Sequence, residues 1–202
     1  MLASAIARRQ TRWTALLLGC VAAAAVSVAA NHASAQVNAG LEGGVAYRFA
    51  TPSLTPGLAY GAHAEGKPIP ILSVGAYYLA YDLGIDGAPS TVSSVAFRSF
   101  GGRVRFTLPL PGSNFRPFAY AGVGYVSVSY PMLSEVVERD GHFVELPIGL
   151  GVGYKLAKLV ELTADVALRP GFGFGGDAYD GPQKYDESNV GLAAMLGAAV
   201  DL

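Results

Sequence analysis

The chain has 202 residues, of which 51% are hydrophobic and only 14% are charged, and its formal net charge is −1. This length allows one domain of ordinary size, and the single cysteine excludes an intramolecular disulfide. The surface of a soluble domain usually carries about a quarter or more of charged residues. The composition is therefore poor in the side chains that cover a water-facing exterior.

The N-terminal segment has the three parts of a secretory signal. Three arginines between residues 8 and 12 form a positive region, residues 15–30 are an apolar run, and Ala33-Ser34-Ala35 fits a small-residue cleavage site. We therefore predict a signal peptide at 1–35, cleavage between Ala35 and Gln36, export through the general secretory route and a mature domain at 36–202. Cleavage removes three arginines and no acidic residue, which takes the formal charge from −1 to −4 and argues against general nucleic-acid binding.

Two other interpretations of this segment stay open. Leu17-Leu18-Gly19-Cys20 resembles a lipobox, which would make Cys20 a lipidated N-terminus. The apolar run before it is very short, however, and a second apolar stretch follows it. A retained transmembrane anchor is the other interpretation, although the alanine-rich run is short and weakly apolar for a span.

Strict alternation of apolar and other side chains marks four segments of the mature chain. They lie, in chain order, at 37–49, 144–156, 160–169 and 189–202. In the second of them, Val144, Ile148 and Val152 share one parity, while Glu145 and Gly149 share the other. A period of two places the two sets on opposite faces of a β-strand.

Alternation by itself does not decide which face meets solvent, because a soluble barrel alternates as well. The low charge content indicates which face is inside, because the polar face has too few charges to be a water-facing exterior. Its glycine, alanine, serine and few charged residues suit a crowded polar interior, and the aliphatic face suits lipid. We predict an all-β fold, an eight-stranded antiparallel up-and-down transmembrane β-barrel. Its strands are expected near 37–49, 57–66, 71–83, 99–108, 117–130, 142–155, 158–169 and 188–202.

The connections between these strands alternate in length. Short ones fall near 66–70, 109–116 and 155–158, and longer ones near 84–98, 131–141 and 170–187. Bacterial barrels pair short periplasmic turns with longer external loops, so the alternation places both termini on the periplasmic side. Near 75–81 and 119–125 both faces of a strand carry apolar residues, which either a β-bulge or a lumen of mixed polarity would explain.

Aromatic residues near the strand ends suit the interfacial girdles of such a barrel. Tyrosine and phenylalanine alone would form them, because the only tryptophan lies in the signal. The expected girdle residues are Tyr47, Phe49, Tyr81, Tyr130 and Phe143 at the outer ends and Phe106, Phe118, Tyr120 and Tyr154 at the inner ends.

Three stretches carry a resemblance to a known family. Arg116–Tyr125 reads RPFAYAGVGY, Gly149–Tyr154 reads GLGVGY before a tight turn, and the last strand has Gly197, Val200 and Leu202 at the spacing of an assembly signal. The mature chain is similar to the small eight-stranded outer-membrane barrels of the OmpA/OmpX-like superfamily, the outer-membrane β-barrel domain proteins. The resemblance implies location in the bacterial outer membrane and recognition by the barrel-assembly machinery through the C-terminal strand. That family usually ends in an aromatic residue, where this chain has Leu202.

The polar parity of the predicted strands collects charged residues in the lumen. An eight-stranded barrel encloses a space that side chains just fill, so opposite charges there have to pair or be hydrated. The first interpretation is a salt-bridged, plugged interior, and the alternative is a narrow gated pore for small solutes or ions, lined by Arg103, Arg105, Glu145 and Glu161. The residues of this lumen-charge network are Glu42, Arg48, His63, Glu65, Arg103, Arg105, Glu145, Glu161, Asp165 and Arg169.

An enzyme is the last alternative, because some eight-stranded barrels modify lipids. Nucleophilic hydrolysis needs a serine activated by a histidine, and the mature chain keeps only His63 and His142, neither in a recognisable Ser/His arrangement. We therefore predict no catalytic residue. The glycine-rich segment 171–181 matches no calcium-loop spacing, so neither a metal nor another cofactor is predicted.

The function that follows is a non-enzymatic integral outer-membrane protein with a structural or surface-interaction role. Its expected partners are outer-membrane lipid and glycolipid, the barrel-assembly machinery and an unidentified protein bound by the loops, with no nucleic acid among them. Acidic external residues would bind glycolipid through divalent cations, and these residues are Glu135, Glu138, Asp140, Asp177, Asp180, Asp186 and Glu187.

Overall fold

The structure is a computed structural model that describes residues 36–49, 54–85, 94–131, 138–175 and 189–202. These residues form strands and connecting turns, and none of them belongs to a helix long and apolar enough to cross a membrane. The predicted all-β class is therefore confirmed. The strands are β1 (Gln36–Phe49), β2 (Leu54–Thr55), β3 (Gly57–Ile69), β4 (Leu72–Ile85), β5 (Val95–Thr107), β6 (Phe115–Pro131), β7 (Glu138–Glu145), β8 (Ile148–Lys155), β9 (Val160–Gly175) and β10 (Val190–Asp201).

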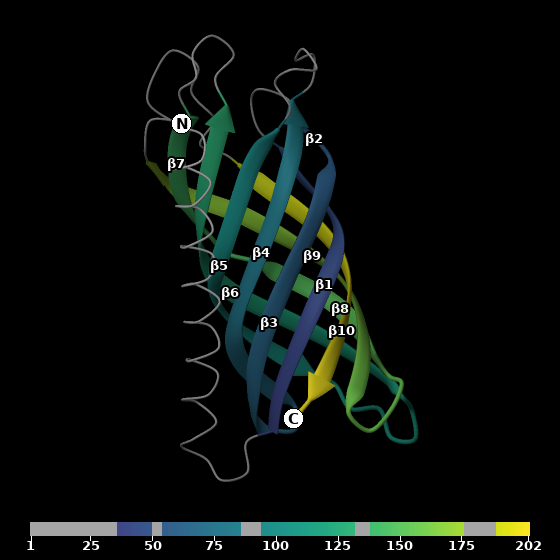
Figure 1. Cartoon of the computed structure of the whole chain (residues 1–202). Coiled ribbons are helices and arrows are strands. Elements are labelled where there is room, and N and C mark those ends of the chain that lie inside the picture. The colour runs from purple at the N-terminus through teal and green to yellow at the C-terminus, as the bar shows by residue number, and fades with distance from the viewer. Residues whose placement is uncertain (1–35, 50–53, 86–93, 132–137, 176–188) are drawn as a thin grey trace, which may run out of the picture.

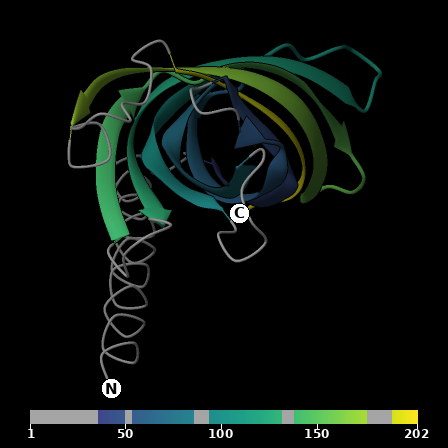
Figure 2. The ribbon, with the colours of Figure 1, turned by 90° about the horizontal axis from the view of Figure 1, so that it is seen from above.

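The sheet closes on itself because its first strand pairs with its last. β1 and β10 are antiparallel neighbours along most of their length. Beyond the end of that ladder, Val37 and Leu202 exchange two backbone hydrogen bonds, with N···O distances of 3.3 and 2.7 Å. In lipid, such closure leaves no strand edge with unsatisfied N–H and C=O groups. Figure 1 shows the strands tilted along the barrel, and Figure 2 shows the ring that they form when seen from above.

Eight antiparallel strand paths make up the wall within the described part of the chain. Neighbours follow the chain from β1 through β3, β4 and β5 to β6, and β9 leads back through β10 to β1. Between β6 and β9 lie β7 and β8, which follow one another along a single path because both pair with β6 and both pair with β9. The two-residue β2 only extends the pairing of β4. The eight-stranded antiparallel barrel predicted from the sequence is confirmed.

The path shared by β7 and β8 is interrupted at Leu146 and Pro147. Proline has no N–H to donate to a ladder, and the neighbouring residue on β9 is a second proline, Pro170. Gly122 N donates to Pro147 O at 2.9 Å and Leu146 N donates to Pro170 O at 3.0 Å, but neither proline can return a hydrogen bond. The predicted strand at 142–155 is thus one path through the wall whose ladder is weakened at its middle.

The two ends of the barrel differ in what they carry. Gln36 and Leu202 lie at one end, together with the turns at 70–71, 108–114 and 156–159, and we call this the turn end. The opposite end, at which β1, β4, β6 and β9 finish, is the loop end. In Figure 1 the turn end is at the bottom, where the label of the C-terminus stands.

The aliphatic side chains of the strands face outward, as predicted. Leu41, Leu150 and Leu196 are 71%, 70% and 69% exposed in the isolated chain, as lipid-facing residues should be. Glu65 and Glu145 have the opposite parity and are completely buried. The barrel is therefore apolar outside and charged inside, the reverse of a soluble barrel.

Four aromatic residues that were predicted for the girdles point into the lumen instead. Tyr81 and Phe143 are 1% and 0% exposed, and Phe118 and Tyr120 are also buried, so these four assignments are wrong. The ladders of β4 are regular through 75–81 and that between β5 and β6 is regular through 119–125, so a lumen of mixed polarity explains both segments and a bulge does not. A narrow lumen needs large side chains to fill it. Phe49, Phe106 and Tyr154 are exposed, and Tyr47 is half-buried. The side chain of Tyr130 lies outside the described part of the chain.

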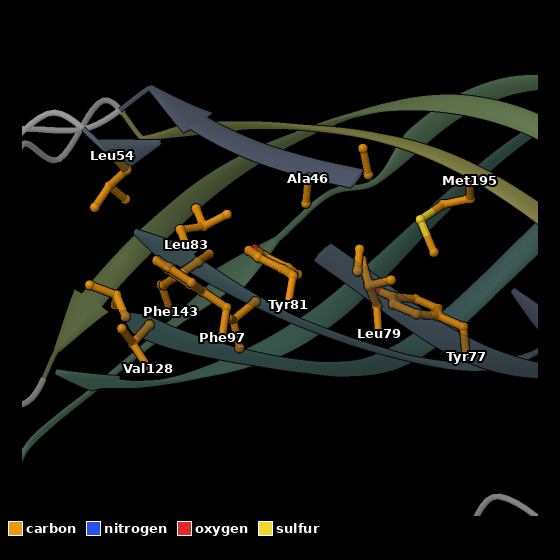
Figure 3. Packing of buried hydrophobic residues seen from close by; sticks show 14 residues of the cluster. Ala46, Leu54, Tyr77, Leu79, Tyr81, Leu83, Phe97, Val128, Phe143 and Met195 are labelled. Atoms are coloured by element: carbon orange, nitrogen blue, oxygen red, sulfur yellow. The ribbon is translucent and has the colours of Figure 1, made fainter. Parts of the chain in front are cut away.

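Apolar side chains fill the loop-end half of the lumen (Figure 3). Within this group Tyr81 stacks on Phe97, with ring centroids 5.0 Å apart and planes 11° apart. Offset stacking and burial of such rings both stabilise the packing. We name as the loop-end plug the buried residues Leu54, Leu83, Val95, Phe97, Val126, Val128 and Phe143. The lumen is therefore divided into an apolar outer half and a charged inner half.

Candidate functional site

All ten residues of the predicted lumen-charge network lie inside the barrel. They come from five strands, because on each strand the inward parity carries the charged residues. β1 contributes Glu42 and Arg48, β3 contributes His63 and Glu65, β5 contributes Arg103 and Arg105, β7 contributes Glu145, and β9 contributes Glu161, Asp165 and Arg169. The structure divides them among three levels along the axis, and the levels are built differently.

The level next to the loop-end plug is organised around Glu145. Its carboxylate accepts hydrogen bonds from Arg48 Nη2 at 3.0 Å and from Arg169, whose Nε lies 3.2 Å away and whose Nη2 contacts the other oxygen. The Ser99 hydroxyl donates to the same carboxylate at 2.5 Å and the Tyr77 hydroxyl at 3.2 Å. All five side chains are buried. Two guanidinium groups thus share one carboxylate. We call these five side chains the Glu145 cluster.

Arg48 is held in the cluster by aromatic and polar neighbours as well as by charge. Its Nε donates to the Tyr81 hydroxyl at 2.8 Å and its Nη1 donates to Asn189 Oδ1 at 3.1 Å. The guanidinium also lies over the ring of Phe143, 4.5 Å from the centroid, and over that of Phe97 at 5.3 Å. A desolvated cation needs this number of partners. Arg48 therefore joins the charged cluster to the loop-end plug.

The middle level contains an ion pair and a tyrosine–carboxylate contact. Arg103 Nε donates to Glu65 Oε1 at 2.5 Å, and the guanidinium lies 5.3 Å from the centroid of the Tyr120 ring. The Tyr120 hydroxyl donates to Asp165 Oδ1 at 2.8 Å. These contacts tie β3, β5, β6 and β9 together across the lumen.

A small cavity and an unsatisfied histidine also belong to this level. Glu42 and Asp165 border a cavity of about 10 Å³, which is room for about one water molecule. His63 lies 4.0 Å from Glu42, beyond hydrogen-bond distance, and neither of its ring nitrogens has a hydrogen-bond partner among the described residues. The middle level is thus the loosest part of the network.

The level at the turn end gathers bases around two carboxylates. Arg105 Nη2 donates to Glu161 Oε1 at 2.7 Å, and its guanidinium lies 3.8 Å from the centroid of the Phe118 ring. Asp201 accepts hydrogen bonds from Lys67 at 2.5 Å and from Asn38 at 2.9 Å. It also lies 3.6 Å from Lys155. This level is open to solvent at the turn end, because Lys67 and Lys155 are partly exposed.

Sequence reasoning did not include several uncharged members of these levels. The hydroxyl and amide groups that bind the charged residues of the Glu145 cluster are those of Tyr77, Tyr81, Ser99 and Asn189. Inward parity was the available signal for Ser99, which alternates in step with Arg103 and Arg105 on β5, and for Asn189, which alternates in step with Asp201. Tyr77 and Tyr81 lie on β4, whose only charged residue, Asp82, has the opposite parity, so no such signal was available for them. Their role depends on Glu145 lying at the same level, and no strand shows that by itself.

The ring of Tyr120 packs closely on Gly149, so one methyl group added at Gly149 should destabilise the barrel. We expect Gly149→Ala to lower the free energy of unfolding by about 1–3 kcal/mol, because overpacking a filled interior costs this much. The new Cβ would lie 2.3 Å from Cζ of Tyr120. Gly43→Ala is the matched control, since its Cβ would meet nothing nearer than Ala59 O at 3.9 Å. Equal denaturant midpoints for the two variants in vesicles would show that the Tyr120 ring does not pack on Gly149.

The sequence matches the profile of one protein family over most of its length. Residues 14–195 match the family described as outer membrane protein beta-barrel domain. The chain belongs to this family. It is therefore an integral outer-membrane β-barrel protein, and the resemblance drawn from its sequence is confirmed. No curated protein sequence matches the chain.

Solved structures of small outer-membrane barrels share this fold. Neisserial surface protein A is 15% identical, with a TM-score of 0.66 over 82% of this chain and 97% of its own. The N-terminal β-barrel domain of OprF from Pseudomonas aeruginosa is 13% identical, with a TM-score of 0.55 over 84% and 100% of the two chains. The attachment invasion locus protein Ail of Yersinia pestis is 9% identical, with a TM-score of 0.55 over 84% and 99%. At these identities the likeness shows the fold alone.

Membership in the family orients the outer-membrane barrel. Bacterial barrels place short turns in the periplasm and longer loops outside, so the turn end faces the periplasm and the loop end faces the cell exterior. Residues 1–35 lie outside the described part of the chain, and Gln36 begins β1. The signal peptide and its cleavage after Ala35 stay predictions.

Proposed function

We propose that this outer-membrane protein is a sealed, non-enzymatic barrel with a structural or surface-interaction role. The observation that carries the proposal is the filling of the lumen at two successive levels. The loop-end plug and the Glu145 cluster lie one behind the other, and every side chain in them is buried. Ions crossing the lumen would have to separate Arg48 and Arg169 from Glu145 and also displace Phe97 and Phe143.

Conductance tests this proposal against a narrow gated pore. We expect the wild-type barrel to give no steady current in a planar lipid bilayer, because the loop-end plug and the Glu145 cluster block the axis. Phe97→Ala combined with Phe143→Ala removes two plug side chains that pack beside Arg48, and this variant should show more frequent current steps than the wild type. Steady wild-type current that changes in Arg103→Gln or Arg105→Gln would establish the pore and overturn the sealed barrel.

The histidines of the described chain support the non-enzymatic part of the proposal. A serine nucleophile needs a histidine within hydrogen-bond reach as its base. His63 has no hydrogen-bond partner among the described residues, and His142 stacks on Tyr125 with ring centroids 5.8 Å apart. Neither histidine is arranged as an activated base in this structure.

The surface-interaction role rests on the fold and on the names of similar proteins. Two of the similar structures are named for a surface or an attachment function. The acidic residues proposed to bind glycolipid lie in segments whose side chains are outside the described part of the chain. Contact with glycolipid or a protein through the loops, assembly through β10 and export through the secretory route belong to the proposal.

A further inference from the structure

A cavity opens into the periplasmic mouth of the barrel, separate from the charged middle of the lumen. Its volume is about 320 Å³, at the lower end of the range of about 300–1,000 Å³ for small-molecule pockets. Four of its lining residues are the last inward-facing side chains at the turn ends of β1, β3, β5 and β6, namely Gln36, Lys67, Thr107 and Arg116. The cavity therefore belongs to the lumen and faces the periplasm rather than lipid.

The lining of this cavity is basic. Among its described lining residues, Lys67 and Arg116 are cationic and none is acidic. Arg116 Nη1 lies 3.9 Å from Glu161, beyond hydrogen-bond distance, and its side chain is 32% exposed. Lys67 donates one hydrogen bond to Asp201 and has two further N–H groups.

Positive charge also exceeds negative charge just behind the cavity. Glu161 is paired at closer range with Arg105, at 2.7 Å, than with Arg116. Asp201 is shared between Lys67 and Lys155, at 2.5 and 3.6 Å. Among these six side chains, four are basic and two are carboxylates, so positive charges exceed negative charges by two.

Part of the lining of the cavity is apolar and conformationally restricted. Pro68, Ile69, Pro70 and Pro109 line it, and proline fixes the backbone angle φ of its own residue. A pocket whose shape is present before binding loses less conformational entropy when a ligand enters. The cavity therefore combines preformed apolar surface with two cationic donors.

The geometry points to a binding site for a small periplasmic anion that carries a carboxylate or phosphate beside an apolar group. The planar guanidinium of Arg116, on β6, offers parallel N–H donors that match either oxyanion, and Lys67 adds a second positive charge from β3. The prolines would contact the apolar part of the ligand. Because the loop-end plug fills the far half of the lumen, the anion would enter and leave from the periplasm. This site does not depend on the surface role proposed above.

Titration of the folded, full-length barrel in zwitterionic detergent tests the site, with inorganic phosphate and N-acetylalanine as the probes. We expect both probes to bind, and we expect Arg116→Gln and Lys67→Gln each to raise the dissociation constant about tenfold by removing a charge-assisted hydrogen bond. Lys158→Gln is the matched control, because Lys158 is an exposed turn residue that carries the same charge and does not line the cavity. Its dissociation constants should stay within about twofold of the wild type.

Three results would overturn the site. The first is the absence of saturable binding of either probe. The second is an equal loss of affinity in all three variants, which would show diffuse attraction at the barrel rim. The third is binding that appears only to phosphatidylglycerol in mixed nanodiscs, which would show a lipid headgroup contact. A gel-mobility shift between unboiled and boiled samples verifies that each variant is folded. If one cavity variant fails to fold, the other is compared with Lys158→Gln and decides the question.

Discussion

Glu145→Gln is expected to lower the free energy of unfolding of the barrel by about 3–5 kcal/mol, the range measured when one partner of a buried ion pair is removed. Glutamine has nearly the same shape and still accepts hydrogen bonds from Ser99 and Tyr77. It cannot neutralise Arg48 and Arg169, which would remain buried as two unpaired cations. The loss is therefore electrostatic and not a consequence of a new cavity.

Urea titration in phosphatidylcholine vesicles measures this effect, with the folded fraction read from gel mobility without boiling. Asp82→Asn is the matched control, since it also removes one carboxylate from an arginine pair, that with Arg98 at 2.8 Å. That pair is about a third to a half exposed, at 34% and 47%, so its loss should change stability by less than about 1 kcal/mol. Equal effects of the two variants would show that the lumen around Glu145 is hydrated and that its ion pairs are weak.

Leu150→Arg is expected to lower the free energy of unfolding of the barrel in a bilayer by about 2–4 kcal/mol, because it places a charge near the middle of the lipid-facing surface. Leu150 is 70% exposed and lies between two inward-facing glycines of β8. Its neighbours across the wall are Ala119 on β6 and Val166 on β9, which lie inside their strands, four and six residues from Phe115 and Val160 at the turn end. An arginine there cannot easily carry its charge to either interface.

Leu156→Arg is the control for depth, on the same path through the wall. Leu156 is 63% exposed, close to the value for Leu150, but it lies in the turn that follows β8. An arginine at that position reaches the periplasmic interface, where the effect falls to about 0–1 kcal/mol. Both variants are compared by the urea titration used for Glu145→Gln. A loss at Leu156 as large as that at Leu150 would contradict the membrane position assigned to β8.

The sequence by itself determined the strands and their two faces. In 144–156 and 190–201 a period of two separates aliphatic from small or charged residues, and the low charge content tells which face meets lipid. These properties are local, since each strand displays its own parity whatever lies beside it. The eight strands, the lipid-facing leucines and the inward charges could therefore be predicted, together with the family.

Only the tertiary structure decided which inward side chains share a level of the lumen. Glu145 and Arg48 are 97 positions apart, and their contact depends on how far each of several strands is displaced along its neighbour when the barrel closes. The basic periplasmic cavity has the same origin, since Lys67 and Arg116 meet only where strands from different parts of the chain end together. Tyr81 and Phe143 were assigned to the girdles because they lie near strand ends, but a side chain's parity decides whether it faces lipid or lumen, and Phe143 has the inward parity of Glu145. The parity of a side chain is a property of its own strand. The displacement of one strand along the next is a property of the closed barrel, so it cannot be deduced from any single strand.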